Sequence, residues 1–338
     1  MNKPLLLTTL ALAIIVFYFT GAAFSFSILE QTIAATAAFL LFLSAAMRGM
    51  YQYFVTTLAA FSVSLSLGCA FLNVKEVTGP FVVNLTLNPW LIIIFSALVA
   101  GGAWLWQEKG KSKKRFAAIM LWLFVLNWII LAVNVKFYDD WKMENWLTVP
   151  FVIVIYLTHR WFKLSNLSYG LIFLFMMLHI YGSHYTYSDV PFGFWLQDVF
   201  DAARNHYDRI VHFSFGLLLA YPIREIIVRI SDTKGFWGYW FPVEFVLAFS
   251  AIYELMEWGI AVIFGGDLGV AYLGTQGDVW DAQKDMFLAG LGSFIAMSII
   301  ALIVWYYRRS DFWREFWESF SVKRKEALGE EALKKMRR

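Results

Sequence analysis

The sequence contains little charge and almost no cysteine. Only 16% of its 338 residues are charged, whereas 60% are hydrophobic and 19% are aromatic. Because a soluble domain carries about a quarter charged residues, this composition places the chain among membrane proteins. A single cysteine, Cys69, excludes a disulfide framework and a cysteine-based metal site. The net charge of +3 is too small to predict a nucleic-acid partner.

The sequence also lacks the signatures of common soluble enzymes. It has no phosphate-binding glycine loop, no dinucleotide-binding fingerprint, no His-Glu-x-x-His zinc helix and no nucleophile elbow. The glycines of "GVAYLGTQG" at 269–277 lie in a loop that no strand precedes. Any chemistry must therefore come from side chains that separate segments bring together.

Long apolar runs, by contrast, occur throughout the chain. About 20 apolar residues are needed for a helix to cross a bilayer. The sequence therefore predicts an all-α, polytopic transmembrane bundle of about ten spans. The first run is expected to be a retained helix, and a cleaved signal peptide is the alternative. The runs lie near 5–24, 31–47, 52–72, 87–106, 116–136, 146–158, 167–184, 209–228, 239–262 and 285–307.

The distribution of basic residues predicts the orientation of these spans. With ten spans and a cytoplasmic N-terminus, 22 of the 28 Lys and Arg residues fall on the cytoplasmic side. Cytoplasmic loops carry the excess of Lys and Arg. We therefore expect a multi-pass protein of the plasma (inner) membrane with both termini in the cytoplasm.

A polar break and a charged tail divide the chain into four parts. "QEKGKSKKR" at 107–115 interrupts the early spans, so 1–107 is predicted to be a four-helix membrane portion and 108–115 a basic cytoplasmic linker. Residues 116–307 would form a six-helix membrane domain. In the tail, 308–338, "FWREFWESF" places aromatic residues along one helical stripe, which predicts an amphipathic helix lying at the membrane interface.

Titratable side chains recur where four predicted spans reach the outer side. Asp208 and His212 share one helix face through their i, i+4 spacing, and Glu254 and Glu257 share another through i, i+3. The segment "HIYGSHYTY" brings His179 and His184 to the same level, and "QGDVWDAQKDM" adds Asp278, Asp281 and Asp285. Carboxylates within a span cost about 2.5–3.5 kcal/mol each unless they meet partners or water. The pattern therefore predicts one polar site near the outer surface.

The residue types indicate the chemistry of this site. Two facing carboxylates provide an acid/base pair, and imidazoles with carboxylates suit a divalent metal such as zinc, manganese or iron. Catalytic roles are expected for Asp208, His212, Glu254, Glu257, Asp281 and Asp285. The candidate metal ligands are His179, His184, His212, Glu254 and Asp285. Contacts to a substrate are expected from Arg204, Tyr207, Arg209 and Lys284.

Structural interpretations of the same residues stay open. Asp208 and His212 are alternatively a structural pair, and the two glutamates are alternatively bridged to Arg204 or Arg209 as internal ion pairs. For Asp278, we expect an N-cap of the last span rather than a ligand.

Several separated motifs resemble a known family. "YTYSDVPFGFWLQD", "RNHYDR", "YELMEW" and "GTQGDVWDAQKDM" are similar to the YjdF-like family of bacterial inner-membrane proteins over residues 116–307. That resemblance implies an architecture but no mechanism. The order Asp-x-x-x-His, Glu, Asp also resembles VanZ-like proteins, which are linked to glycopeptide-antibiotic resistance. The residues of this chain that match that pattern are Asp208, His212, Glu254, Asp281 and Asp285.

Three functions compete on these observations. The first is a cell-envelope protein that binds a membrane lipid or a lipid-linked molecule at the polar site. A second is a metal- or acid/base-dependent hydrolase or transferase embedded in the membrane. The third, an ion-coupled transporter, would need polar residues across the membrane, yet "GLLLAYPI" and "SIIALIVW" provide no relay.

Overall fold

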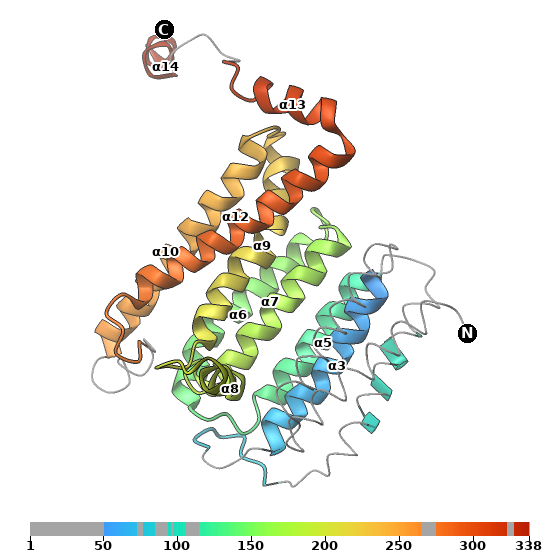
Figure 1. Ribbon diagram of the computed structural model, residues 1–338, viewed down its shortest axis with the longest axis vertical. Helices are drawn as coiled ribbons and strands as arrows, with labels where there is room; N and C mark the ends of the chain where they lie inside the picture. Colours follow the sequence, from blue (N-terminus) through green and yellow to red (C-terminus); the bar gives the residue numbers. More distant parts are fainter. Residues whose placement is uncertain are drawn as a thin grey trace.

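The computed structural model is all-helical in the residues that it describes, which are 51–72, 77–84, parts of 94–105, 115–264, 275–322 and 328–337. Figure 1 shows long helices lying side by side in a bundle. The helices are α3 (Tyr51–Leu72), α5 (Phe116–Leu131), α6 (Tyr138–Thr158), α7 (Asn166–Tyr185), α8 (Pro191–Phe200), α9 (Tyr207–Ser231), α10 (Trp237–Phe264), α12 (Asp281–Tyr307), α13 (Arg309–Glu318) and α14 (Leu328–Met336).

Four helices of the described residues are long and apolar enough to cross a membrane. They are Asn166–Tyr185, Tyr207–Ser231, Trp237–Ile263 and Asp281–Tyr307. These helices correspond to the last four predicted spans. Leu58–Phe71 and Phe116–Leu131 are shorter apolar helices. The predicted spans near 5–24 and 31–47 and most of that near 87–106 lie outside the described residues, as does the basic linker up to residue 114.

Helices α9 and α12 approach each other closely because glycine lies at their crossing. A Cβ atom added at Gly216 of α9 would lie 1.8 Å from the carbonyl oxygen of Ala289. In the same way, a Cβ atom at Gly292 of α12 would lie 2.2 Å from the carbonyl oxygen of Phe213. Small residues allow such close backbone contact between membrane helices. The crossing lies about one helical turn from His212 and from Asp285.

The buried apolar side chains form two clusters that α9 connects. The larger cluster contains residues of α3, α5, α7 and α9, such as Val63, Leu123 and Ile180. The smaller cluster joins α9, α10 and α12 through Ala220, Val246 and other residues. Figure 1 shows the same arrangement, with α3 and α5 on one side of α7 and with α9, α10 and α12 on the other.

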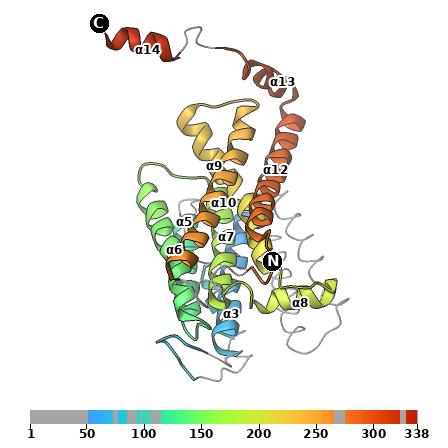
Figure 2. The same cartoon turned by 90° about the vertical axis from the view of Figure 1, so that its left-hand side faces the viewer.

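Two short helices lie at opposite ends of the bundle. In Figure 2, α8 runs across the end at which α9 begins, and α13 lies at the other end. Helix α13 confirms that the aromatic tail segment is helical. Part of its aromatic stripe packs on the start of α10, because the Phe316 ring contacts Phe236 and the Phe312 ring contacts Tyr239. The Trp317 side chain remains 67% exposed, and the interfacial position of this helix stays a prediction.

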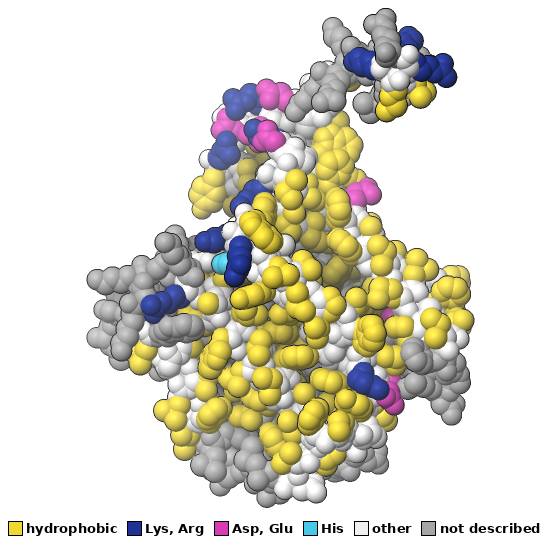
Figure 3. Space-filling view, turned by 180° about the vertical axis from the view of Figure 1, so that it is seen from behind, with side chains coloured by type: hydrophobic (Ala, Val, Ile, Leu, Met, Phe, Trp, Pro, Cys, Tyr) yellow, Lys and Arg dark blue, Asp and Glu magenta, His cyan; other side chains and the backbone are white. Residues whose placement is uncertain are grey.

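The surface agrees with a membrane environment. Figure 3 shows hydrophobic side chains covering the middle of one face, while most of the charged side chains visible there gather toward the α13 end. Large apolar residues that are exposed on α10 and α12 include Leu255, Val262, Phe287, Phe294 and Leu302. An exposed apolar surface of this extent marks contact with lipid.

Candidate functional site

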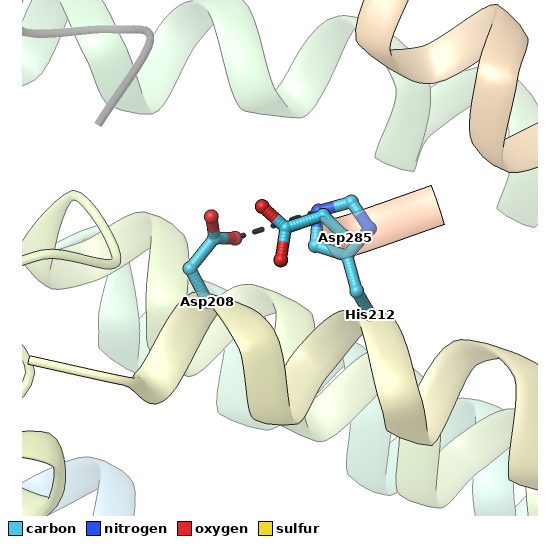
Figure 4. A group of neighbouring side chains, drawn as sticks. All are labelled: Asp208, His212 and Asp285. Carbon is cyan, nitrogen blue, oxygen red and sulfur yellow. Dashed lines mark ion pairs between the residues drawn. The ribbon is translucent and has the colours of Figure 1, made fainter. Parts of the chain in front are cut away.

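Two carboxylates and an imidazole meet where α9 and α12 pack together. Asp208 and His212 lie in the first two turns of α9, and Asp285 lies in the second turn of α12. One ligand atom from each side chain lies within 4.8 Å of the other two. Figure 4 shows Asp208 and His212 rising from the same helix and the Asp285 carboxylate pointing toward both. Asp285 is 2% exposed.

A third helix adds a carboxylate to this group. The Oε1 atom of Glu254, on α10, lies 3.6 Å from Nε2 of His212, and Oδ1 of Asp208 lies at the same distance from that nitrogen. Both distances exceed a hydrogen bond. Glu257 interacts electrostatically with Asp208 and Glu254. We name Asp208, His212, Glu254 and Asp285 the acidic cluster.

The acidic cluster contains buried polar atoms that lack hydrogen-bond partners. Among the described residues, neither Oε1 of Glu254 nor Oδ1 of Asp285 accepts a hydrogen bond. A buried acceptor without a partner costs about 1–3 kcal/mol, and a charged one costs more. Both atoms are therefore available for a further hydrogen bond or for coordination.

The nearby basic side chains are engaged elsewhere. Arg204 donates from Nη1 to Oδ1 of Asp281 at 2.5 Å and also to the carbonyl oxygen of Thr275. Arg209 donates to Asp278 and, at 3.2 Å, to Asp281, while Nζ of Lys284 lies 2.6 Å from Oδ2 of Asp278. The structure thus places these predicted substrate contacts in an ion-pair network. Asp281 belongs to that network too, rather than to the acidic cluster.

Asp278 organises the start of α12. Its Oδ1 atom accepts a hydrogen bond from the backbone N–H of Trp280 at 3.1 Å, as a residue before a helix does. Hydrogen bonds from Lys284, the Trp280 N–H and Arg209 hold the pKa of the Asp278 carboxyl well below its ordinary value. The predicted N-cap role is not confirmed, because Trp280 occupies the N-cap position of α12 and Asp278, two residues earlier, contacts the backbone N–H of Trp280 instead.

The two histidines of α7 do not belong to the group of ligand atoms that Asp208, His212 and Asp285 form, and each has its own partners. Nε2 of His179 lies 2.7 Å from the Thr148 hydroxyl, and Nδ1 lies 2.5 Å from the Tyr187 hydroxyl. His184 is 2% exposed, and its Nδ1 atom lies 2.8 Å from the carbonyl oxygen of Leu131. With both ring nitrogens engaged, His179 has no free atom for a metal in this arrangement.

Tyr207 and Asn205 hold the beginning of α9 in place. The Tyr207 side chain is 1% exposed, and its hydroxyl donates to the carbonyl oxygen of Leu178 at 2.8 Å. Asn205 and Gln276 exchange two hydrogen bonds of 3.0 Å, which join the loop before α9 to the loop before α12. These contacts fix where Asp208 lies, and they leave Tyr207 buried away from the surface.

Sequence reasoning missed Glu144 of α6. This residue is 5% exposed, and its Oε2 atom accepts a hydrogen bond from the Tyr253 hydroxyl at 3.1 Å. The i, i+4 spacing of Asp140, Glu144 and Thr148 would have indicated a polar helix face. The predicted span began at residue 146, so it did not include Asp140 and Glu144.

A cavity of about 480 Å³ borders the acidic cluster. It lies between α6, α7, α9 and α10. Its polar end is lined by Thr148, His179, Tyr187, Asp208, His212 and Tyr253. The rest of its wall is mostly apolar. The apolar lining includes Leu147, Phe151, Ile155, Leu164, Phe175, Phe215, Leu219, Ile223, Ile226, Phe249 and Met256.

Comparison with known proteins places the chain in a family. Residues 116–307 match the family described as "Predicted membrane protein (DUF2238)". The chain belongs to the DUF2238 family. The chain is also 40% identical over 182 residues to the inner membrane protein YjdF of Escherichia coli (strain K12), covering 52% of this chain and 85% of that protein. No solved structure matches the chain significantly.

The family match confirms the YjdF-like resemblance, and its bounds agree with those expected from the motifs. The acidic cluster and the ion-pair network both lie within the DUF2238 region. The resemblance to VanZ-like proteins and the assigned roles of the site residues stay predictions.

Proposed function

We propose that this DUF2238 protein binds a membrane amphiphile, a lipid or a lipid-linked molecule of the cell envelope. Its hydrocarbon chain would lie in the cavity and its polar head would lie at the acidic cluster. The observation that carries this proposal is the composition of the cavity wall, which is acidic and aromatic at one end and apolar along the rest. A few polar groups at one end of an otherwise apolar cavity orient an amphiphilic ligand.

The length of the cavity supports a long hydrocarbon chain. Its lining on α9 extends from Asp208 to Ile226, which corresponds to about 27 Å of helix. The hydrocarbon core of a bilayer is about 30 Å thick, so in the proposed topology a cavity of this length would continue beyond the middle of the membrane. We therefore favour a ligand whose chain is longer than one leaflet is deep.

The proposed topology determines which side the head faces. In the ten-span arrangement, the excess of Lys and Arg lies in the cytoplasm with both termini. The beginning of α9 then faces outward, and the acidic cluster lies in the outer half of the membrane. We propose that the polar head is taken from the outer leaflet.

Lipid analysis of the purified protein tests this proposal. Mass spectrometry of the detergent-purified chain is expected to detect one enriched amphiphile class at about one equivalent. Ser250, which is 2% exposed, lines the cavity, so Ser250→Trp is expected to displace the chain. Ile299→Trp provides the matched control because Ile299 is 49% exposed on α12.

The comparison between these variants decides the outcome. A lipid content of Ser250→Trp equal to that of Ile299→Trp and of wild type would overturn the proposal. Gel filtration and thermal unfolding report whether each variant is folded. If Ser250→Trp does not fold, a competition experiment on wild type replaces it. The binding of a fluorescent long-chain lipid is then measured in the presence of short-chain analogues. Equal competition by short and long chains would then count against a long cavity ligand.

One observation favours an enzyme as the second candidate. His212 lies between two carboxylates at 3.6 Å each, and this arrangement suits a general base whose orientation a carboxylate sets. Glu254→Gln distinguishes the candidates, since loss of lipid conversion with retained lipid binding supports catalysis. Lost binding without any detectable conversion in wild type supports the binding protein.

A further inference from the structure

We propose that Asp208, His212 and Asp285 form a divalent-cation site, which Glu254 joins as a fourth ligand once its side chain rotates toward the ion. The site would be shared by α9, α10 and α12 and would lie beside the polar end of the cavity. It does not depend on the proposed lipid binding, because the ligand atoms belong to the protein.

The geometry of the donors is compatible with one ion. The ligand atoms of Asp208, His212 and Asp285 lie within 4.8 Å of one another, and they point toward a common centre (Figure 4). Donors at about 2.0–2.2 Å from an ion are at most about 4.4 Å apart. Side-chain movements of a few tenths of an ångström would therefore bring these three ligand atoms within bonding distance of one ion.

The hydrogen bonds of the cluster point independently to a missing cation. Oδ1 of Asp285 and Oε1 of Glu254 are buried acceptors without a hydrogen-bond partner among the described residues. Nε2 of His212 lies 3.6 Å from both neighbouring carboxylates, too far to donate to either. One ion between α9 and α12 would bind Asp285 and His212 at once, and Glu254 of α10 would reach it after a side-chain rotation.

The charge balance leads to the same conclusion. Within the described residues, no Lys or Arg forms an ion pair with Asp208, Glu254 or Asp285. The nearest basic side chains are those of the ion-pair network, and they form their ion pairs with Asp278 and Asp281. Three carboxylates at membrane depth therefore need protons or a cation from solution.

The ligand types select the class of metal. One imidazole and three carboxylates suit Mn²⁺, Fe²⁺ or Zn²⁺, whereas the absence of thiolate and thioether ligands does not favour Cu⁺. A bound cation would also change what the cavity accepts. It would convert an acidic end, which repels phosphate, into one that binds an anionic headgroup.

Metal binding by the full-length, detergent-purified protein tests the site. After equilibration with Mn²⁺ and removal of free ion, elemental analysis and electron paramagnetic resonance are expected to detect about one bound ion per chain. Asp285→Asn is expected to weaken binding by at least about tenfold. Asp198→Asn makes the same chemical change at an exposed position of α8 and should bind like wild type.

A second measurement separates binding from folding. Mn²⁺ should raise the unfolding temperature of wild type and of Asp198→Asn, while a chelator should reverse the shift, because only the folded state assembles the site. Asp285→Asn should fold but show no such shift. The site is refuted if wild type retains no stoichiometric ion, or if Asp285→Asn binds and shifts as wild type does. Lipid retained without metal would refute the site and leave the proposed lipid binding intact.

Discussion

Gly216 of α9 faces the carbonyl oxygen of Ala289 on α12 so closely that even one methyl group at position 216 would collide with it. His212 lies one turn before Gly216, and Asp285 lies one turn before Ala289. The distance between the two helices at this glycine therefore determines whether His212 and Asp285 can meet. A packing contact between backbones thus sets the geometry of the acidic cluster.

Gly216→Ala is expected to separate α9 from α12. Overpacking of this kind costs about 1–3 kcal/mol, and the displaced Asp285 should also weaken Mn²⁺ binding. Gly259→Ala on α10 is the matched control, because nothing lies within 4 Å of a Cβ atom there. Thermal unfolding in detergent and Mn²⁺ titration measure both effects. Equal behaviour of the two variants would contradict the role of the crossing.

The sequence predicts the acidic cluster well because helical periodicity and membrane depth determine it. The i, i+4 spacing puts Asp208 and His212 on one face, and counting residues along the spans puts Glu254 and Asp285 at the same depth. The last four predicted spans appear as long apolar helices for the same reason.

The partners of the other predicted site residues depend on loop conformation and helix packing. The helical periodicity of the sequence does not reveal either. Arg204 pairs with Asp281 across 77 residues, and its position depends on the contact of Asn205 with Gln276. The two histidines of α7 find partners on α6, on the segment after α7 and at the end of α5. The cavity is equally invisible in the sequence, because it arises where four helices do not fill the space between them.

The ion-pair network should give the beginning of α12 a characteristic pH dependence. Lys284, the Trp280 N–H and Arg209 depress the pKa of Asp278, so its carboxylate stabilises the fold above the ordinary value of 3.8. That contribution is lost as the pH falls through the depressed value in the folded state. Asp278→Asn should therefore lower the unfolding temperature at pH 7. The difference from wild type should shrink progressively below pH 3.8, and a difference independent of pH would argue against this role.

Substitution of His179 should separate a structural histidine from a ligand. His179→Ala leaves the hydroxyls of Thr148 and Tyr187 without their partner, which is expected to cost about 1–3 kcal/mol of stability. Mn²⁺ affinity should stay within about twofold of wild type, whereas His212→Ala should lose it. Unfolding and metal titration of the two variants provide the test. Loss of Mn²⁺ binding in both variants would indicate that His179 is a metal ligand.

The hydrogen bond between Tyr253 and Glu144 joins α10 to α6 across the polar end of the cavity. Tyr253→Phe removes the donor and leaves a buried carboxylate without it, which should cost about 1–3 kcal/mol. Glu144→Gln keeps an acceptor of the same shape and should cost less.

A double-mutant cycle of these two positions should show a coupling energy of about 0.5–3 kcal/mol, since the residues are in direct contact. Because the bond lies beside the proposed head position, Tyr253→Phe should also release bound lipid faster than wild type does, as measured by exchange with a fluorescent lipid. Additive energies in the cycle would mean that the two side chains act independently. An unchanged release rate would show that lipid leaves the cavity by another route.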